Sequence, residues 1–412
     1  MTSVIRGNAL ALPLADNSVD LICTSPPYFA LRSYQDAGEH YTAHIGSEAT
    51  PAEFVDALIA ATREMVRVVK PSGSIWVNLG DKYAGGGMGG HSAGLVGTRP
   101  QGEGNAYRRV RVDTPAKSLI GVPWRYALRC IDDLGLILRA EVIWSKPNGL
   151  PESVTDRVRR SHETWFHFTR EPRYYSAVDE IREAHEHPKA IAYNLRNGGP
   201  TTGSKHNSDR GDAGVSNLGG NPLGKLPGSV WSIPTQPLRV PAELGIDHFA
   251  AFPMEWPRRI IQGWSPSGVC TACGEGRRPV THKKPMEWKP SARLDAMRAV
   301  NPDGLRPTSG TMLSAAETTI TGYACACPEP TAPTTPARVL DPFGGTGTTA
   351  LVAKALGRQG ISVDMSADYC RLAKWRTTDE GELANAMQVE KPAVQVEGQV
   401  SMFDLLDEGG AA

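Results

Sequence analysis

The chain of 412 residues carries 44 basic and 44 acidic side chains and is 40% hydrophobic, enough for one large core with appendages or for two domains. No apolar run is long enough to cross a bilayer, and the N-terminus lacks the basic start and apolar stretch of a signal peptide, so we expect a cytoplasmic protein without membrane contact. The cysteines number seven, and four of them form two tight pairs, which favours metal binding over a secreted disulfide scaffold.

The neutral net charge hides an asymmetry between the body and the C-terminal tail. Residues 377–412 hold eight acidic side chains against Lys391 alone, so the remaining body has 43 basic and 36 acidic residues. A basic body fits a polyanionic partner, although many solvated surfaces have the same composition.

The N-terminal part alternates strand and helix patterns. Residues 19–23 form an apolar run that predicts a buried strand, and residues 51–69 place apolar side chains at helical spacing. Residues 71–73 break this helix, and residues 74–79 predict a second buried strand. A strand, a helix and a strand in this rhythm indicate a βαβ unit and a parallel sheet. A helix at 123–134 and strands at 138–144 and 164–169 follow.

The C-terminal half divides by composition. Residues 187–245 are rich in Gly, Asn, Ser, Thr and Pro with an excess of basic residues, a pattern typical of a long functional loop. A short helix is expected after Pro253. Residues 270–336 form a Cys-rich insert and a linker. Strands at 338–341 and 360–364 and helices at 346–356 and 367–376 predict a second βαβ unit, and residues 377–412 an acidic, disordered tail.

The strand at 19–23 runs into Thr24-Ser25-Pro26-Pro27-Tyr28. Two prolines fix φ, remove two backbone donors and end the strand. Ser25 and the nearby carbonyls are then available as acceptors, and Tyr28 offers an aromatic face. This arrangement suits a planar heterocycle with an exocyclic amine, but taken alone it fits a rigid strand exit equally well.

Residues 341–349, DPFGGTGTT, form a Gly-rich turn between a strand and a helix. Glycines allow a ligand to approach the backbone closely, and the helix N-terminus supplies donors. A phosphate-binding loop would need a Lys that is absent here. Asp364 ends the next strand, where an acidic residue accepts ribose hydroxyls in doubly wound folds. The two features together predict a nucleoside-type cofactor.

The two motifs together resemble the β class of S-adenosylmethionine-dependent DNA amino-methyltransferases, in which the catalytic motif precedes the cofactor motif. The resemblance covers most of residues 4–376 and implies an α/β fold with a circularly permuted Rossmann-like methyltransferase sheet, an inserted DNA-recognition region and a small zinc-binding insert. It implies a catalytic half at 1–186, target recognition at 187–245, a cofactor-side helix at 246–269, the Cys-rich insert at 270–336 and a cofactor-binding half at 337–376. In that family residues 138–148 and 162–170 resemble a closing antiparallel hairpin.

The resemblance also implies roles for single residues. A flipped base would stack on Tyr28 while Ser25 and the carbonyl of Pro26, next to Pro27, accept hydrogen bonds from its amine. S-Adenosylmethionine would be held by Asp341, Phe343, Gly344, Gly345, Gly347, Thr348, Asp364, Asn8, Phe252 and Pro253. Asn8 stands where the family usually has Asp.

Three alternatives remain open at this stage. SPPY favours N4 of cytosine over N6 of adenine, although some adenine enzymes also carry Ser. A non-catalytic DNA-binding protein with a decayed fold is a second alternative, and both intact motifs argue against it. Methylation of protein glutamine or of RNA is a third, but that family typically has Asn before Pro-Pro and the opposite motif order.

Two further motifs lie outside the methyltransferase pattern. Cys270, Cys273, Cys325 and Cys327 have the residue type of a tetrahedral zinc site, with buried free thiols as the alternative. Gln399, Met402 and Phe403 lie in QVSMF, which resembles a bacterial sliding-clamp-binding peptide; an idle tail is the alternative. The expected partners are therefore double-stranded DNA and a sliding clamp.

Overall fold

The computed structural model describes residues 2–29, 44–84, 114–149, 151–184, 223–246, 251–284, 317–329 and 331–390, together with four short strands at 35–36, 39–40, 288–290 and 310–312. Among these residues no helix has both the length and the apolar character needed to cross a membrane. Most of the predicted recognition region 187–245 and all of the peptide with Gln399, Met402 and Phe403 lie outside the described residues.

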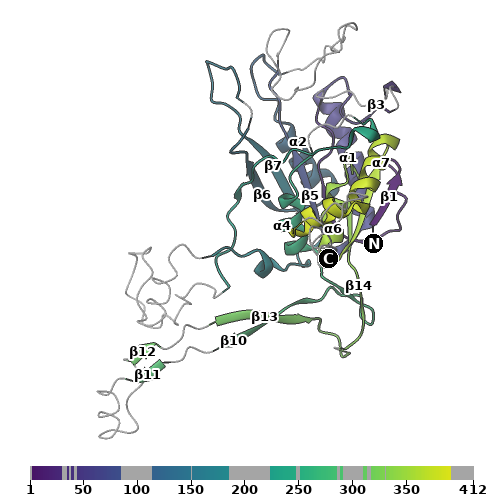
Figure 1. Ribbon diagram of the computed structural model, residues 1–412. Helices are drawn as coiled ribbons and strands as arrows, with labels where there is room; N and C mark the ends of the chain where they lie inside the picture. Colours follow the sequence, from purple (N-terminus) through teal and green to yellow (C-terminus); the bar gives the residue numbers. More distant parts are fainter. Residues whose placement is uncertain are drawn as a thin grey trace, which may run out of the picture.

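An eight-stranded sheet forms the centre of the molecule, in the order β1-β16-β15-β2-β5-β7-β6-β8 (Figure 1). The five strands β1, β16, β15, β2 and β5 are parallel to one another. Strand β7 runs antiparallel to both β5 and β6, and β8 is parallel to β6. The bounds of the sheet strands are β1 (Thr2–Arg6), β2 (Val19–Thr24), β5 (Val69–Leu79), β6 (Ile137–Ser145), β7 (His162–Thr169), β8 (Val230–Ser232), β15 (Arg338–Asp341) and β16 (Gln359–Asp364).

The two ends of the sequence meet in the middle of this sheet. Strand β15 lies between β16 and β2, with Val339 beside Leu21 and Leu340 beside Ile22. The predicted βαβ units and the antiparallel hairpin of β6 and β7 are confirmed by this pairing. The sheet is therefore mixed and mostly parallel, and its parallel strands end at one common edge.

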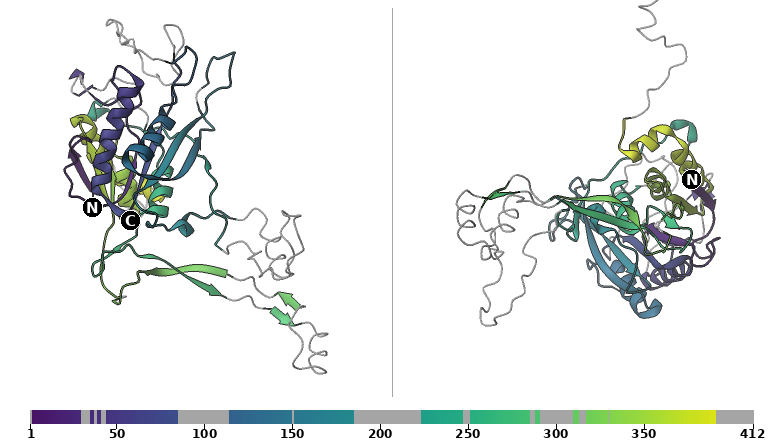
Figure 2. Two further views of the ribbon diagram at one scale, coloured as in Figure 1. Left: turned by 180° about the vertical axis from the view of Figure 1, so that it is seen from behind. Right: turned by 90° about the horizontal axis from the view of Figure 1, so that it is seen from below.

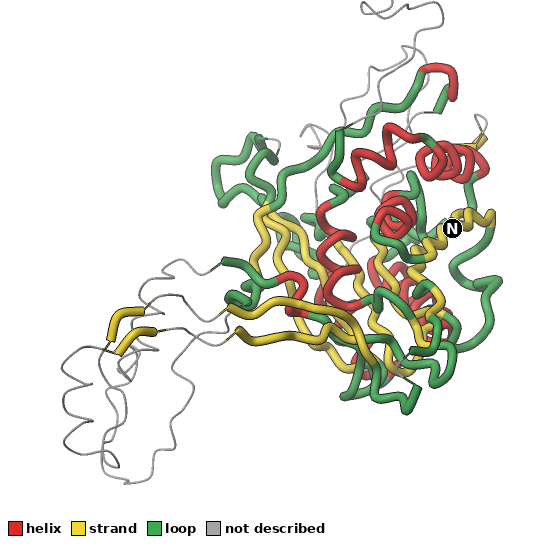
Figure 3. Tube along the Cα trace, turned by 60° about the horizontal axis from the view of Figure 1, so that its bottom comes forward, coloured by secondary structure: helices red, strands yellow, loops and turns green. Residues whose placement is uncertain are grey.

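Helices cover both faces of the sheet (Figures 1 and 3). On one face α1 (Pro51–Val68) and α2 (Val122–Leu134) pack against Ile22 and Phe166, and on the other α4 (Glu255–Trp264) and α6 (Thr348–Ala355) pack against Leu21 and Trp165. Neighbouring residues of a strand thus point to opposite faces, and the apolar run of β2 is buried on both. The remaining helices are α7 (Ala367–Thr378), α8 (Glu380–Met387) and the single turns η1 (Val178–Ile181) and η2 (Ala242–Leu244).

Helix α1 begins at a capping box formed by Thr50 and Glu53, and its apolar stripe lies on the sheet. The helix ends at Val68, before residues 71–73 as predicted, but β5 starts at Val69 and includes these residues, whereas the prediction began the strand at residue 74. Gly73 allows this continuation: a Cβ there would lie 2.6 Å from Val69 and 2.8 Å from the Asp20 carbonyl oxygen.

An arm of two antiparallel strands, β10 (Arg278–Lys284) and β13 (Glu317–Ala324), projects from the body (Figures 2 and 3). Its root is the short pair β9 (Val269–Cys270) and β14 (Thr334–Thr335), and β11 (Trp288–Pro290) pairs with β12 (Gly310–Met312) farther out. A last short pair, β3 (Gln35–Asp36) and β4 (Glu39–His40), follows β2. Because β14 directly precedes β15, the arm starts at the amino-terminal end of the parallel strands.

The prediction of a disordered tail from residue 377 is wrong for its first part. Residues 380–387 form α8, with Ala384 and Ala386 buried against α6. Arg376 at the end of α7 is 2% exposed and donates from Nε to Glu382 of α8 at 2.9 Å. Acidic composition suggested disorder, but one of these acids partners a buried cation, which composition does not reveal.

We expect Glu382→Ala to lower the free energy of unfolding by about 3 kcal/mol, because it leaves the buried Arg376 guanidinium without its carboxylate. Urea denaturation of the purified chain measures this. Glu390→Ala, which removes an exposed acid just beyond α8, is the control and should stay within about 0.5 kcal/mol of wild type. Equal stability of both variants would contradict the role of the pair.

Candidate active site

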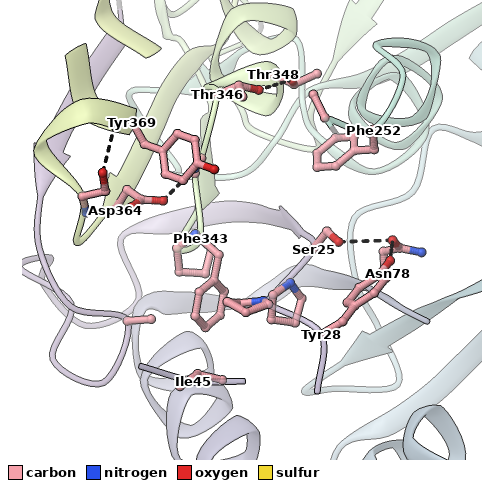
Figure 4. Close-up of a pocket in the computed structure, with 18 of the residues that line it drawn as sticks. Ser25, Tyr28, Ile45, Asn78, Phe252, Phe343, Thr346, Thr348, Asp364 and Tyr369 are labelled. Carbon is pink, nitrogen blue, oxygen red and sulfur yellow. Dashed lines mark hydrogen bonds between the residues drawn. The ribbon is translucent and has the colours of Figure 1, made fainter. Parts of the chain in front are cut away.

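A cavity of about 510 Å³ opens at the carboxyl-terminal edge of the parallel strands (Figure 4). This is the edge at which open α/β sheets bind ligands. Its wall combines segments from both ends of the sequence, including residues 25–28 after β2, residues 342–346 after β15 and residues 364–366 after β16. The fold therefore brings the two predicted motifs to one continuous site.

All four predicted catalytic residues line the cavity: Ser25, Pro26, Pro27 and Tyr28. They follow β2, whose six residues are all buried, so the chain leaves the sheet at a fixed point. The side chain of Asn78, at the end of the adjacent strand β5, is also in the wall.

Asn78 is the centre of a hydrogen-bond network in the cavity (Figure 4). Its Oδ1 accepts from the hydroxyl of Ser25 at 3.2 Å and from the hydroxyl of Tyr28 at 2.7 Å. Its Nδ2 donates to the carbonyl oxygen of Thr164 on β7 at 3.2 Å, which fixes the orientation of the amide. Asn78 is 1% exposed, so these bonds form away from bulk water.

A charged pair extends this network from the ends of β6 and β7. The Tyr28 hydroxyl lies 2.7 Å from Oε2 of Glu163, and Lys146 Nζ donates to the other oxygen of the same carboxylate. The Lys146 ammonium also lies 4.2 Å from the ring centroid of Trp144, a cation–π distance. Both charges line the cavity.

Sequence reasoning missed Asn78, Trp144, Lys146 and Glu163 as site residues. Each of them stands at the end of a strand that was predicted, and the convergence of strand ends at one edge was the available signal. For Lys146 and Glu163 the convergence of strand ends was not enough to predict a contact. Their strands β6 and β7 are antiparallel, and only the register of this pair brings the two side chains together.

The ring of Tyr28 rests on Gly80, the residue after β5's Leu79. A Cβ at Gly80 would lie 2.6 Å from Cε2 of Tyr28 and 3.0 Å from Cδ2. Only glycine allows this close approach, and the glycine backbone thus supports one side of the aromatic ring.

The predicted cofactor residues fall into two groups. Seven line the cavity: Asn8, Phe252, Phe343, Gly344, Gly345, Thr348 and Asp364. Asp364 accepts from the backbone amide of Gly345 at 2.8 Å and from that of Ser366 at 2.9 Å, so it ties the Gly-rich turn to the end of β16. Gly344 passes so close to β16 that a Cβ would lie 1.9 Å from Ser362 Oγ.

Asp341, Gly347 and Pro253 do not line the cavity, which departs from the prediction. Gly347 has φ +76° and begins α6, where a side chain would collide with Ala373. Asp341 is 1% exposed and lies beneath the turn. We therefore assign these two residues a structural place under the cavity wall.

Asp341 joins the catalytic segment to the cofactor segment. One carboxylate oxygen accepts from the Thr24 hydroxyl at 2.6 Å and from the Phe343 amide at 3.1 Å, and the other accepts from Thr349 Oγ1 at 3.0 Å. Burial raises the pKa of this carboxyl to about 6, and the hydrogen bonds from Thr24, Phe343 and Thr349 oppose that rise.

The Gly-rich turn is also held from below by Arg376. Its Nη1 donates to Thr348 Oγ1 at 2.9 Å and to the carbonyl oxygen of Thr346 at 3.1 Å. The wall of the cavity is therefore fixed by a buried cation whose charge is balanced by Glu382 in α8.

The Gly-rich turn and the acid on the next strand share one cavity with the segment that carries Ser25 and Tyr28. This arrangement is typical of enzymes that use a nucleoside-type cofactor. The family model described as "DNA methylase", for N6 and N4 methyltransferases, matches residues 19–270 and 337–375. The chain belongs to this family and is an S-adenosylmethionine-dependent DNA amino-methyltransferase.

Two relatives show the extent of the similarity. The type II methyltransferase M.SmaI of Serratia marcescens is 27% identical over 358 residues, which covers 87% of this chain and 83% of that protein. The type II methyltransferase M.Cfr9I of Citrobacter freundii is 38% identical over 189 residues, 44% of this chain and 58% of the relative. Among solved structures, the PvuII DNA methyltransferase (cytosine-N4-specific) shares the fold with a TM-score of 0.50 at 17% identity, covering 94% of this chain and 95% of that one.

The raised pKa of Asp341 predicts a pH dependence of stability. Between about pH 4 and pH 6 the folded chain binds a proton that the unfolded chain, with the ordinary pKa of 3.8, has lost. The contribution of Asp341 to the free energy of unfolding therefore falls as pH rises through this window. Asp341→Asn has no such titration, and its amide can still accept from Thr24 and donate to Thr349.

We expect the stability of Asp341→Asn relative to wild type to rise by roughly 3 kcal/mol between about pH 4 and pH 7, since one pKa unit corresponds to about 1.4 kcal/mol. Urea denaturation of both chains across this range measures the difference. A difference that does not vary with pH would show that Asp341 titrates alike in the folded and unfolded chain.

Proposed function

We propose that the chain is a circularly permuted methyltransferase that transfers a methyl group from S-adenosylmethionine to N4 of a flipped cytosine in DNA. The observation that carries this proposal is the single cavity lined by Ser25, Tyr28, Phe343 and Asp364. The two motifs stand 313 residues apart between Tyr28 and Asp341. If only one of the two motifs had a function, the fold would not need to bring both to the same cavity.

The order of the strands supports the permutation. Strands β2 and β5, which carry the catalytic segment, precede β15 and β16, which carry the cofactor segment, yet all four are neighbours in the sheet. A chain that began at β15 and continued from β16 to β1 would build the same sheet.

The cavity walls fit S-adenosylmethionine at the end formed by β15 and β16. The Gly-rich turn brings backbone close to the cavity, Phe343 and Phe252 add apolar surface, and Asp364 supplies carboxylate oxygens for ribose hydroxyls. The cofactor supplies an electrophilic methyl group on a sulfonium. The chain's own part is to hold the acceptor amine in line with that methyl group.

Asn78 makes Ser25 an acceptor toward the cavity. Because Asn78 Oδ1 accepts the hydroxyl proton of Ser25, the lone pairs of Ser25 Oγ are left for an N–H of the target base. The bond from Asn78 Nδ2 to Thr164 keeps the amide from turning its donor toward Ser25. The Pro26 carbonyl is the second acceptor in this proposal, and both bonds draw the amine lone pair out of conjugation.

Tyr28 provides the stacking surface for the flipped base, and Gly80 supports its ring. Glu163 and Lys146 then hold the hydroxyl end of the ring at the mouth of the cavity. Stacking and edge contacts offset the few kcal/mol that base flipping costs.

Cytosine N4 is the favoured target for two reasons. The motif starts with Ser25, as in SPPY enzymes that act on N4, and the structural relative with the TM-score of 0.50 is titled cytosine-N4-specific. N6 of adenine is the alternative, and the same acceptors would serve it. A non-catalytic role is disfavoured because the intact acceptor network has no purpose without an amine to bind.

Double-stranded DNA is the proposed partner, with residues 187–245 as the recognition region and the cytoplasm as the location. A sliding clamp bound through Gln399, Met402 and Phe403 stays a prediction from the sequence. Its test is retention of the chain by purified clamp and loss of retention in Phe403→Ala.

Expression of the chain in a host without other DNA methylation should produce N4-methylcytosine, measured by mass spectrometry of nucleosides from the host DNA. We expect Ser25→Ala to lower the signal about a hundred-fold, because the amine loses an acceptor, and Thr378→Ala, which removes an exposed hydroxyl at the end of α7, to retain it. N6-methyladenine alone would overturn the cytosine assignment, and unmethylated DNA with a folded, cofactor-binding chain would overturn the proposed reaction.

The acceptor role of Ser25 predicts coupling with Asn78. We expect Asn78→Ala to lower kcat by about ten- to a hundred-fold, with little change in cofactor affinity. In a Ser25→Ala background, whose residual kcat is still measurable, the same substitution should cost clearly less, because of the two hydroxyls that Asn78 orients only that of Tyr28 is left. Equal fold losses from Asn78→Ala in both backgrounds would show that Asn78 acts only on stability or packing.

A further inference from the structure

The Cys-rich insert lies outside the family pattern, since the match to the family model breaks between residues 270 and 337. In the structure the insert is the arm of β10 and β13, and its root holds all four predicted metal-binding cysteines. The Sγ atoms of Cys270, Cys273, Cys325 and Cys327 all lie within 4.8 Å of one another. We propose that these four thiolates bind one zinc ion, which closes the root of the arm.

The local backbone is shaped for such a site. After Cys270 the chain makes a tight turn, in which the Gly274 amide donates to the Cys270 carbonyl at 2.9 Å and the Cys270 amide donates to the Glu275 carbonyl at 2.9 Å. Gly274 has φ +74°, a conformation that favours glycine. This turn places Cys270 and Cys273 on one side, and the end of β13 presents Cys325 and Cys327 from the other leg.

The distances suit tetrahedral coordination. Zinc bound by four thiolates at about 2.3 Å holds the sulfur atoms about 3.8 Å apart, so a small inward shift from the observed spacing completes the site. Four protein ligands leave no open position, which makes the ion structural and places it outside the methyl-transfer reaction.

The part of the arm that the structure describes is mainly the two-stranded ribbon of β10 and β13, which a metal ion at its root would reinforce. A two-stranded ribbon is marginally stable alone, and Val280 and Tyr323 on this ribbon are 43% and 42% exposed. It is bonded to the body by, among others, the Tyr323 hydroxyl, which donates to Glu180 at 2.5 Å, and the Tyr175 hydroxyl, which donates to the Arg277 carbonyl oxygen at 3.1 Å. The two cysteine pairs flank a loop of 51 residues, whose described parts are joined by the pairing of β10 with β13 and of β11 with β12. One ion that joins both legs shortens this loop at its base.

Metal analysis combined with native mass spectrometry tests the proposal on the full-length chain. We expect one zinc atom per chain in wild type and in Cys130→Ala, whose cysteine is buried in α2, and less than about one tenth of that in Cys273→Ala with Cys327→Ala. Two disulfides in the intact protein, or full zinc content in the double variant, would overturn the assignment.

Chelation of wild type separates a local effect from a folding failure. Removal of zinc should raise the rate of proteolytic cleavage within residues 271–327 at least ten-fold. Affinity for S-adenosylmethionine should change by less than about two-fold, because none of these residues lines the cavity. Restored protection on adding zinc, but not magnesium, is the expected reversal. An arm that is cleaved equally fast with and without zinc would contradict the closure.

Discussion

The site depends on one buried carboxylate. Asp341 accepts from Thr24 at the end of β2 and from Thr349 at the start of α6, and so holds the catalytic strand against the cofactor strand. Its burial costs free energy, as the pKa of about 6 indicates, and the hydrogen bonds offset part of that cost. Both halves of the cavity are aligned because this tie is inside the sheet and out of reach of the ligand.

The segment with Ser25 and Tyr28 is likewise held in place by residues next to it. Ser25 and Tyr28 face the cavity, whereas Asn78 and Gly80 behind them decide where the hydroxyl proton and the aromatic ring lie. On the cofactor side Arg376 supports the Gly-rich turn, and Glu382 supports Arg376. Side chains that hydrogen-bond to Ser25, Tyr28 and the Gly-rich turn therefore hold the cavity wall in one arrangement.

Two elements lie outside the central sheet: helix α8 and the arm of β10 and β13. Helix α8 is part of the support for the cavity, although its acidic sequence resembles a tail. The arm leaves from the opposite edge of the sheet, and its cysteine cluster lies apart from the residues that line the cavity.

The sequence by itself determined most strands and helices of the central sheet and the two motifs, because apolar periodicity, the prolines after β2 and the glycines after β15 act locally, but it indicated neither α8 nor the strands of the arm. It also indicated the catalytic quartet Ser25 to Tyr28 and the carboxylate of Asp364. Only the tertiary structure decided that Asp341 lies beneath the cavity and that Asn78 and Glu163 lie in its wall. These assignments rest on strand register and on contacts between residues 50 to 317 positions apart, which no local pattern encodes.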